Sequence, residues 1–191
     1  DRTAGTPVRL SVLGVVLRDR QCRPLMVTSS IAFPIMFVIQ TVLGKKFLED
    51  FAGLSSATAA TVIMGIAAGN VVCVTLGGSL PQWCFGGRRR PCILLGASCL
   101  LAATTTLLVA TWLKAPGWVF IPAFLLLSGT VFATPSNLSS IKTLSRPEAV
   151  AIAISLSNGL SYLGSGAIGQ VGGAILACFH GQATENASGI V

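Results

Sequence analysis

The chain has 191 residues, of which 52% are hydrophobic and only 10% are charged, and its formal net charge is +7. Its mean hydropathy is +0.78. Because a soluble globular domain carries about 25% charged residues, this composition excludes an ordinary soluble protein and predicts an integral membrane protein.

The first 24 residues precede the first long apolar run and hold five of the chain's arginines. Residues 7–24 form a moderately amphipathic stretch, in which the mostly apolar residues 8–17 lead into Arg18-Asp19-Arg20. Two interpretations stay open: a helix that lies along the membrane surface, or a linker that only supplies positive charge. In either case we expect residues 1–24 to form a cytoplasmic linker.

Long uncharged windows follow one another through the rest of the chain. A bilayer core about 30 Å thick is crossed by roughly 20 apolar residues in a helix. Windows of this kind lie at about 25–43, 54–80, 92–113, 118–136 and 149–179. They predict an all-α integral membrane protein with a bundle of about five transmembrane helices over residues 25–179.

Two of these windows have features that affect the shape of the helix. Pro34 lies in the middle of the first window and predicts a kink. The fifth window exceeds the length of one crossing by about ten residues, so it must tilt, break or extend beyond the lipid.

All charged residues lie outside the windows. Ten Lys and Arg residues fall in the first, third and fifth connecting segments, and three fall in the second and fourth. Because cytoplasmic loops are enriched in Lys and Arg, this predicts a multi-pass protein of the plasma membrane with a cytoplasmic N-terminus. Residues 180–191 then form a polar extracytoplasmic tail.

The connection after the first window contains two possible ion pairs. Lys45 and Lys46 are each followed four residues later by an acid, Glu49 and Asp50. Opposite charges at this spacing lie on one face of a helix. We therefore predict a short helical turn at the membrane interface.

Small residues recur at every fourth position along the second window, starting one residue before it. They are Gly53, Ala57, Thr61, Gly65, Gly69, Cys73 and Gly77. Such a stripe lets another helix approach closely, and the fifth window adds Gly169 and Gly173 as candidate packing positions. Static packing and a surface along which helices slide during transport are both open interpretations.

Several uncharged polar side chains fall at membrane depth. They are Gln40, Asn70, Asn158, Tyr162 and Gln170. An unsatisfied polar group in hydrocarbon is costly, so each needs a partner in the bundle or in a wet cavity. We predict them as candidates for lining a solute pathway, and hydrogen bonding between helices is the alternative. Convergence on one cavity would favour a transporter, while scattered positions would favour a scaffold.

Nothing in the sequence indicates catalysis, a cofactor or a metal site. The six cysteines have no Cys-x-x-Cys spacing, which predicts packing roles. The single histidine, His180, has no intramembrane acid, base or nucleophile pair beside it. Nucleic acid is not an expected partner either, because the basic residues are divided among separate loops with few aromatic residues between them.

The connection after the second window runs from Gly77 to Pro91 and ends in an arginine triplet. It resembles the loop of the major facilitator superfamily in which a glycine ends one helix and Gly-Arg-Arg or Gly-Arg-Lys opens the next. Gln82 stands where the family has an aspartate, and the loop is longer than the family pattern. A plain arginine cluster that anchors a cytoplasmic turn is the alternative. The resemblance predicts a candidate cytoplasmic gate loop of Gly78, Gln82, Gly87, Arg88, Arg89 and Arg90.

Further phrases resemble the same family in the same order. They are Leu17–Arg20 before the first window, Phe51–Ser55 at the second, and Ser145–Glu148 with Asn158–Gly164 at the fifth. The resemblance covers about residues 15–178 and corresponds to helices seven to eleven of the family's twelve, which are most of one six-helix half.

The family resemblance implies transport of a small solute by alternating access around a site near the bilayer midplane. Its implied partners are the lipid bilayer, an unidentified solute, and the N-terminal half and twelfth helix of the same carrier. The Asp1 start, the odd number of windows and the polar end at residues 186–191 lead us to expect a fragment of a longer product. A membrane scaffold or assembly subunit that transports nothing is the alternative function.

Overall fold

The computed structural model describes residue 14 and residues 16–147 and 149–188, with side chains up to residue 174. Every regular element in these ranges is a helix, which confirms the all-α prediction for the described chain. The α-helices are α2 (Cys22–Val38), α3 (Gly44–Asp50), α4 (Ser56–Cys84), α5 (Arg90–Trp112), α6 (Phe120–Leu126), α7 (Ala133–Leu144) and α8 (Val150–Ser188). A π-helical turn η1 (Ile39–Leu43) and two 3₁₀ segments, η2 (Gly117–Val119) and η3 (Leu127–Phe132), connect some of them end to end.

Four continuous helical stretches are long and apolar enough to cross a membrane. They cover Cys22–Asp50, Ser56–Cys84, Arg90–Trp112 and Gly117–Leu144, and they contain the first four predicted windows almost entirely. All but the first residue of the fifth predicted window, 149–179, falls within α8. This helix is not among the four, so a fifth crossing stays a prediction.

The helices extend beyond several predicted windows. The second continues through Pro81 to Cys84, and the fourth continues to Leu144. α8 reaches Ser188, so part of the polar tail predicted at residues 180–191 belongs to a helix. The reason is that a change from apolar to polar side chains alters the surroundings of a helix but does not break its backbone hydrogen bonds.

Backbone geometry determines where the helices begin and end. Ser55 is an N-cap with extended backbone, and its Oγ accepts a hydrogen bond from the Thr58 backbone N–H at 3.2 Å. After α4, Gly86 and Gly87 have φ angles of +55° and +82°, a region that favours glycine. These glycines turn the chain sharply into α5.

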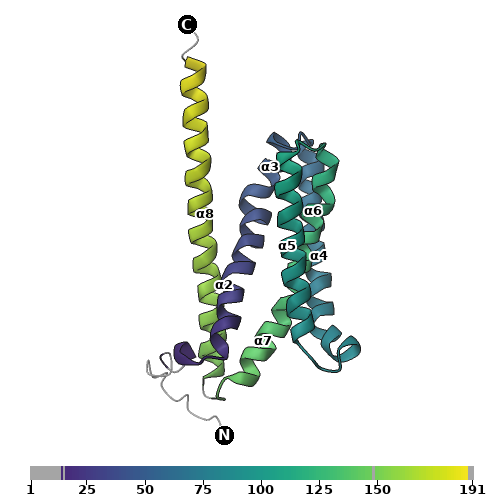
Figure 1. Cartoon of the computed structure of the whole chain (residues 1–191), viewed down its shortest axis with the longest axis vertical. Helices are drawn as coiled ribbons and strands as arrows, with labels where there is room; N and C mark the ends of the chain where they lie inside the picture. The colour runs from purple at the N-terminus through teal and green to yellow at the C-terminus, as the bar shows by residue number, and fades with distance from the viewer. Residues whose placement is uncertain (1–13, 15, 148, 189–191) are drawn as a thin grey trace.

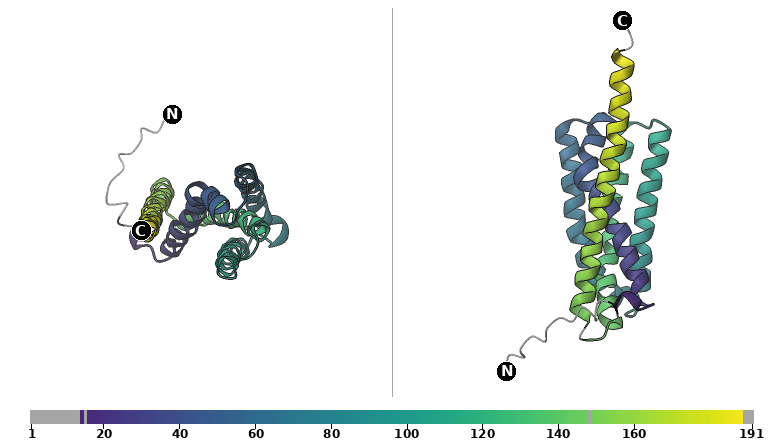
Figure 2. Two further views of the ribbon diagram at one scale, coloured as in Figure 1. Left: turned by 90° about the horizontal axis from the view of Figure 1, so that it is seen from above. Right: turned by 90° about the vertical axis from the view of Figure 1, so that its left-hand side faces the viewer.

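Figure 1 shows α4, α5 and α6 as one group of nearly parallel helices, with α2 and then α8 beside it. The view from above in Figure 2 gives the same order, with α8 at the edge. The main apolar cluster joins α2, α3, α4, α5, α6 and η3 around Leu48, Ile66, Phe120 and Phe124. A smaller cluster at the N-terminal end of the bundle contains Cys22, Met26, Ile141 and Ala153.

Pro34 positions α8 against α2. Proline has no backbone N–H, so the carbonyl oxygen of Ser30, four residues earlier, loses its usual helical partner. A Cβ added to Gly164 of α8 would lie 2.7 Å from that oxygen and 2.9 Å from Cγ of Pro34. The helix continues past Pro34 to Val38 and leaves α geometry only at η1. Because Gly164 has no side chain, α8 can approach α2 closely at Ser30 and Pro34.

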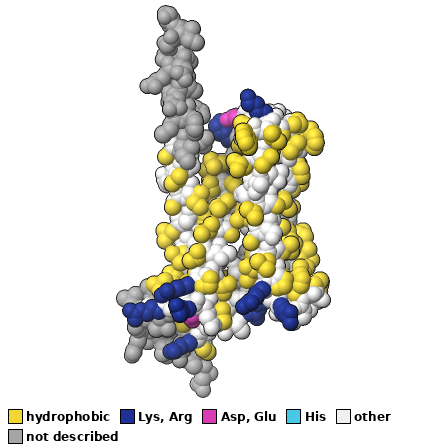
Figure 3. Space-filling model, in the orientation of Figure 1, with side chains coloured by type: hydrophobic (Ala, Val, Ile, Leu, Met, Phe, Trp, Pro, Cys, Tyr) yellow, Lys and Arg dark blue, Asp and Glu magenta, His cyan; other side chains and the backbone are white. Residues whose placement is uncertain are grey.

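The outer surface of the bundle is apolar between two charged ends. Large side chains are widely exposed there; Met64, Leu101 and Leu108 are each about 70% accessible. Figure 3 shows apolar side chains covering the middle of the visible face, with Lys and Arg gathered at the two ends. An exposed apolar band of this extent is suited to lipid, and the structure is that of a membrane-embedded protein.

The predicted helical turn after the first window is α3. Lys46 Nζ lies 2.8 Å from Asp50 Oδ2, and Lys45 Nζ lies 3.6 Å from Glu49 Oε1. The i,i+4 pairing predicted from the sequence is therefore confirmed.

Candidate functional site

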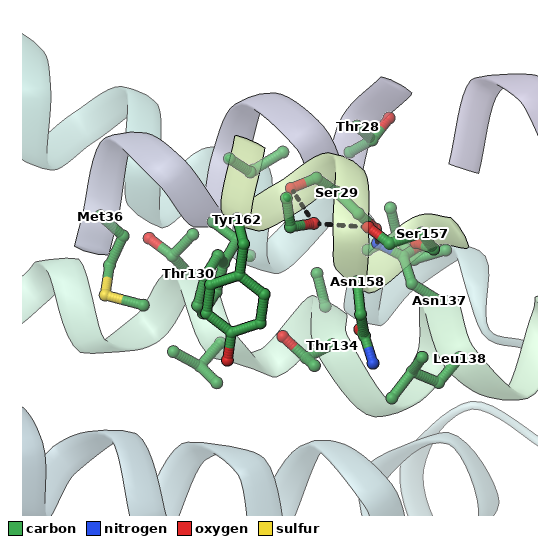
Figure 4. A pocket seen from close by; sticks show the side chains of 18 residues that line it. Thr28, Ser29, Met36, Thr130, Thr134, Asn137, Leu138, Ser157, Asn158 and Tyr162 are labelled. Atoms are coloured by element: carbon green, nitrogen blue, oxygen red, sulfur yellow. Dashed lines mark hydrogen bonds between the residues drawn. The ribbon is translucent and has the colours of Figure 1, made fainter. Parts of the chain in front are cut away.

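A pocket of about 170 Å³ lies between α2, α5, η3, α7 and α8. Figure 4 shows its polar side chains converging from helices that are far apart in the sequence. Its polar lining consists of Thr28, Ser29, Thr130, Thr134, Asn137, Ser157, Asn158, Ser161 and Tyr162. We call it the central pocket.

The central pocket lies well inside the bundle. Thr28 and Met36 of its lining are six and fourteen residues from Cys22, the first residue of α2. At 1.5 Å per residue, this places the pocket about 9–21 Å from the helix end. A polar site at this depth lies in the apolar middle part of the bundle, and it opens to the surface at α8, where Asn158 and Tyr162 are exposed.

Ser29 connects three helices at the pocket wall. Asn137 Nδ2 of α7 donates a hydrogen bond to Ser29 Oγ at 3.4 Å. Ser161 Oγ of α8 donates to the carbonyl oxygen of Ser29 at 3.2 Å and also lies 2.9 Å from the carbonyl oxygen of Ser157. These bonds hold the polar groups in fixed positions along α2, α7 and α8.

Two buried oxygen atoms in the pocket have no hydrogen-bond partner in the described part of the chain. They are Oδ1 of Asn137 and Oγ1 of Thr130, and each residue is only 5% exposed. A buried unsatisfied polar group costs about 1–3 kcal/mol. Since native proteins seldom leave such groups unpaired, these two atoms indicate a bound water or ligand that supplies hydrogen-bond donors.

The lining of the central pocket contains no Asp, Glu, Lys, Arg or His. A charged ligand would therefore meet no opposite charge there, at a high cost of desolvation. Apolar contacts come from Phe33 and Met36, and the Tyr162 ring packs edge-on against Phe33 with centroids 5.8 Å apart. The pocket is smaller than the 300–1,000 Å³ typical of sites for drug-sized ligands, so it suits a small, neutral, hydrogen-bonding molecule.

The predicted pathway residues separate into distinct places. Asn158 and Tyr162 line the central pocket. Asn70 Nδ2 instead donates to Gln40 Oε1 at 3.0 Å and joins α4 to η1 outside that pocket. Gln170 is exposed on α8 and lines none of the cavities described. The five side chains therefore do not converge on one cavity, and the Gln40–Asn70 pair has the interhelical role given above as the alternative.

The Gln40–Asn70 bond is expected to contribute modestly to stability. We predict a coupling free energy of about 0.6 kcal/mol, with an upper limit near 1.7 kcal/mol, the range measured for polar pairs between membrane helices. The measurement is a double-mutant cycle with Gln40→Leu, Asn70→Leu and the double variant, followed by unfolding in detergent. Additive single effects would show that the two amides stabilise the protein independently.

The most important pocket residues were not predicted from the sequence. Ser29, Thr130 and Asn137 are common residue types in membrane helices, and Asn137 follows directly after the predicted window that ends at residue 136. One signal was present: Ser157, Ser161 and Ser165 recur at every fourth position of α8, and all three are buried. A hydroxyl stripe of this kind indicates a polar helix face.

The predicted gate loop is only partly a loop. Gly78 and Gln82 belong to α4, which corrects the prediction that the connection begins at Gly77. Arg89 is the N-cap residue of α5, and Arg90 is its first residue. Arg88 is exposed and lines none of the cavities described.

Part of the small-residue stripe in α4 faces the helix formed by α6 and η3. A Cβ added to Gly65 would lie 2.9 Å from Cδ2 of Leu125. At Gly69 it would lie 2.7 Å from Oγ of Ser128, and at Gly77 it would lie 2.7 Å from the carbonyl oxygen of Phe132. Cys73 completes this face, with Sγ 4.0 Å from Ser128 Oγ. Gly53 lies outside α4 in a turn with φ of +66°.

The two candidate packing glycines of α8 differ from those in α4. A Cβ added to Gly169 or Gly173 would meet no atom of the described chain within 4 Å. The packing partner predicted for these positions is therefore not found in the described part of the bundle.

Comparison with known proteins does not assign the chain to a family. No protein-family model matches the chain, and neither a curated protein nor a solved structure matches it. Within the described residues, no three His, Cys, Asp or Glu side chains are grouped closely enough to hold a metal ion.

Proposed function

We propose that this chain moves a small, neutral, polar solute across a membrane by alternating access, as part of a transporter of the major facilitator type. The observation that carries the proposal is the pair of unpartnered oxygens, Asn137 Oδ1 and Thr130 Oγ1, in a cavity inside an apolar bundle. A solute with hydrogen-bond donors would satisfy both atoms, each of which otherwise lowers stability.

In this mechanism the solute is held by hydrogen bonds. Its O–H or N–H groups donate to Asn137 and Thr130, while the Asn158 amide and the Tyr162 ring form the facing wall on α8. A solute that binds one conformation more tightly than the other shifts the balance between them. Binding in the central pocket is thereby coupled to the movement of the helices that form it.

The irregular helical segments beside the pocket are candidates for the hinges. The π-helical turn η1 follows the pocket residues of α2, and the 3₁₀ segment η3 contains Thr130 itself. Mid-helix segments of both kinds often mark functional hinges. The chain is divided between two apolar clusters, and α2 contributes to both. Bending at η1 and η3 would shift the part of the bundle next to α8 relative to the α4–α5–α6 group.

The resemblance to the major facilitator superfamily supplies the rest of the proposed transporter. It implies that a second six-helix half faces this one, with the solute site between the halves near the midplane. The central pocket would then be one wall of a larger site, which agrees with its small volume of about 170 Å³.

The proposal is tested first by binding and then by transport. We expect at least one solute in a panel of polyols, monosaccharides and small amides to raise the unfolding temperature of the purified chain. A ligand at 100 times its Kd stabilises by about 2.7 kcal/mol. Solutes that stabilise the chain are then assayed for counterflow in proteoliposomes. If no neutral solute stabilises it, the central pocket is not a solute site and the transporter proposal fails.

A scaffold function is favoured by two observations: the five predicted pathway side chains do not converge on one cavity, and α8 has open glycine positions. A Cβ added to Gly166, Gly169 or Gly173 would meet no atom of the described chain within 4 Å, and small residues of this kind suit a partner helix. Crosslinking from cysteines introduced at Ala167 and Val171 distinguishes the two functions. A scaffold gives one abundant membrane partner and no solute binding, whereas a transporter gives solute binding whether or not a partner is captured.

A further inference from the structure

We propose that a second cavity, at the N-terminal end of the bundle, binds a phosphate-bearing anion through Arg89. This cavity, the Arg89 pocket, has a volume of about 220 Å³ and lies between α4, the α4–α5 connection and α7. Its lining includes Gln82, Gly87, Arg89, Ser136 and Ser139. The proposal does not depend on transport, because it involves a different cavity from the central pocket.

Arg89 is held in place at the edge of this pocket. Its Nη1 donates a hydrogen bond to the carbonyl oxygen of Ser139 at 2.9 Å and a second one to Thr143 Oγ1. A guanidinium has five N–H donors in a rigid fork. Two are used to fix Arg89 against α7, and the donors on Nε and Nη2 have no partner among the described residues, so they are available to a ligand.

The charge of Arg89 is not balanced by an acid in the described part of the chain. The ion pairs found there join Lys45 to Glu49 and Lys46 to Asp50, at the opposite end of the bundle. Arg88 and Arg90 are its immediate neighbours in the chain and add to the local positive potential. Arginine is the residue best suited to bidentate binding of phosphate.

A buried hydroxyl gives independent support for a ligand. Ser136 lines the Arg89 pocket and is only 2% exposed, and its Oγ has no hydrogen-bond partner in the described chain. A phosphate oxygen in the pocket would accept the hydrogen of this hydroxyl, so the ligand that pairs with Arg89 would also satisfy Ser136.

The helix start beside Arg89 favours an anion as well. α5 has 23 residues and begins at Arg90, and its N-cap residue, Arg89, makes no capping hydrogen bond with its side chain. The first N–H groups of a helix carry a partial positive charge and bind anions. Pro91, the second residue of α5, has no N–H, so this contribution comes from Arg90 and the residues after Pro91. Gly87 lines the pocket without a side chain, which leaves room for a phosphate group beside Arg89.

The position of the pocket leaves two sources for the phosphate. A larger opening of about 680 Å³ adjoins it and shares Gly87 and Arg89, so a phospholipid headgroup could extend beyond the phosphate. A soluble phosphate would reach the same group from water. Both present the same chemistry to Arg89, and basic pockets between membrane helices are known to bind anionic lipid headgroups.

The experiment compares both sources on the full chain. In neutral detergent at constant ionic strength, inorganic phosphate is titrated against chloride while the unfolding temperature is followed. In parallel, native mass spectrometry measures retention of phosphatidylglycerol against phosphatidylcholine. Stabilisation by phosphate alone identifies a soluble ligand, and selective retention of phosphatidylglycerol identifies a lipid. If neither anion binds better than its control, the proposal is overturned.

Two matched variants distinguish specific binding of the anion in the Arg89 pocket from general attraction of anions to positive charge. Arg89→Gln should weaken binding of the anion by about tenfold to a hundredfold, the effect of losing a charged hydrogen bond. Arg88→Gln removes the same charge from an exposed neighbour outside the pocket and should change affinity by less than about threefold, as for a surface charge. Equal losses in the two variants would contradict the proposal.

Ser136→Ala gives a test that leaves every charge in place. We expect a loss of affinity of about tenfold or more, as for one hydrogen bond to a charged acceptor. The test also applies if Arg89→Gln does not fold, because Ser136→Ala removes only a hydroxyl without a partner in the described chain. Unchanged affinity in Ser136→Ala would show that the anion does not enter the Arg89 pocket.

Discussion

Replacing Gly77 by alanine is expected to destabilise the protein by about 1–3 kcal/mol, the usual cost of overpacking. The added Cβ would lie 2.7 Å from the carbonyl oxygen of Phe132 and 3.1 Å from its Cα. These neighbours are backbone atoms of η3 and cannot rotate away as a side chain could. α4 would have to move away from η3, with loss of the contacts at Gly69 and Cys73 as well.

The adjacent glycine provides a matched control. A Cβ added to Gly78 would meet no atom of the described chain within 4 Å. Both glycines lie in α4, so alanine at either position gains the same helix propensity, about 1 kcal/mol. We expect Gly78→Ala to be neutral or stabilising in the same thermal unfolding assay in detergent. A Gly77→Ala variant as stable as Gly78→Ala would show that α4 does not pack on η3 at this position.

Replacing Asn137 by leucine should weaken solute binding strongly while leaving the fold intact. Leucine has nearly the same size but cannot bond to a solute, and a site built for hydrogen bonds loses affinity strongly when one partner is removed. We expect affinity for the solute found in the binding panel to fall at least about tenfold, which corresponds to 1.4 kcal/mol. Counterflow in proteoliposomes should fall in parallel.

The stability of Asn137→Leu separates a ligand site from a structural role. The substitution removes one long hydrogen bond to Ser29, at 3.4 Å, and at the same time removes a buried oxygen without a partner in the described chain. The lost hydrogen bond costs about 0.5–1.5 kcal/mol and removal of the unpaired oxygen relieves about 1–3 kcal/mol, so the unfolding temperature should stay the same or rise. Gln170→Leu, which removes an exposed amide outside the central pocket, should preserve solute binding. A large loss of stability in Asn137→Leu with unchanged affinity would assign Asn137 a purely structural role.

The helical class and most helix positions were predictable because they depend on local properties of the chain. Hydropathy along about 20 residues determines whether a segment can lie in lipid, and the charged residues mark the limits of each apolar window. The pairing in α3 was predictable for the same reason, since residues four apart on a helix are always neighbours. Helix ends were less predictable, because α4, α7 and α8 extend beyond the windows that suggested them.

The candidate site depended on information that is not local. The Ser29–Asn137 bond joins residues 108 positions apart, and the Ser29–Ser161 bond joins residues 132 apart. Whether two polar groups meet across such separations depends on how each helix is rotated and where it crosses its neighbours. Small changes in rotation decide this, and side-chain composition alone does not specify them.

The sequence by itself therefore determined that this is an all-α membrane protein, where its first four membrane-length helices lie, and that charge is kept to the connections between windows. Only the tertiary structure decided which polar side chains share a cavity: it paired Gln40 with Asn70, grouped Ser29, Thr130, Asn137, Asn158 and Tyr162, and left Gln170 outside. The physical reason is that burial in lipid is set by the average polarity of a segment, whereas a binding site is set by the contacts between faces of different helices.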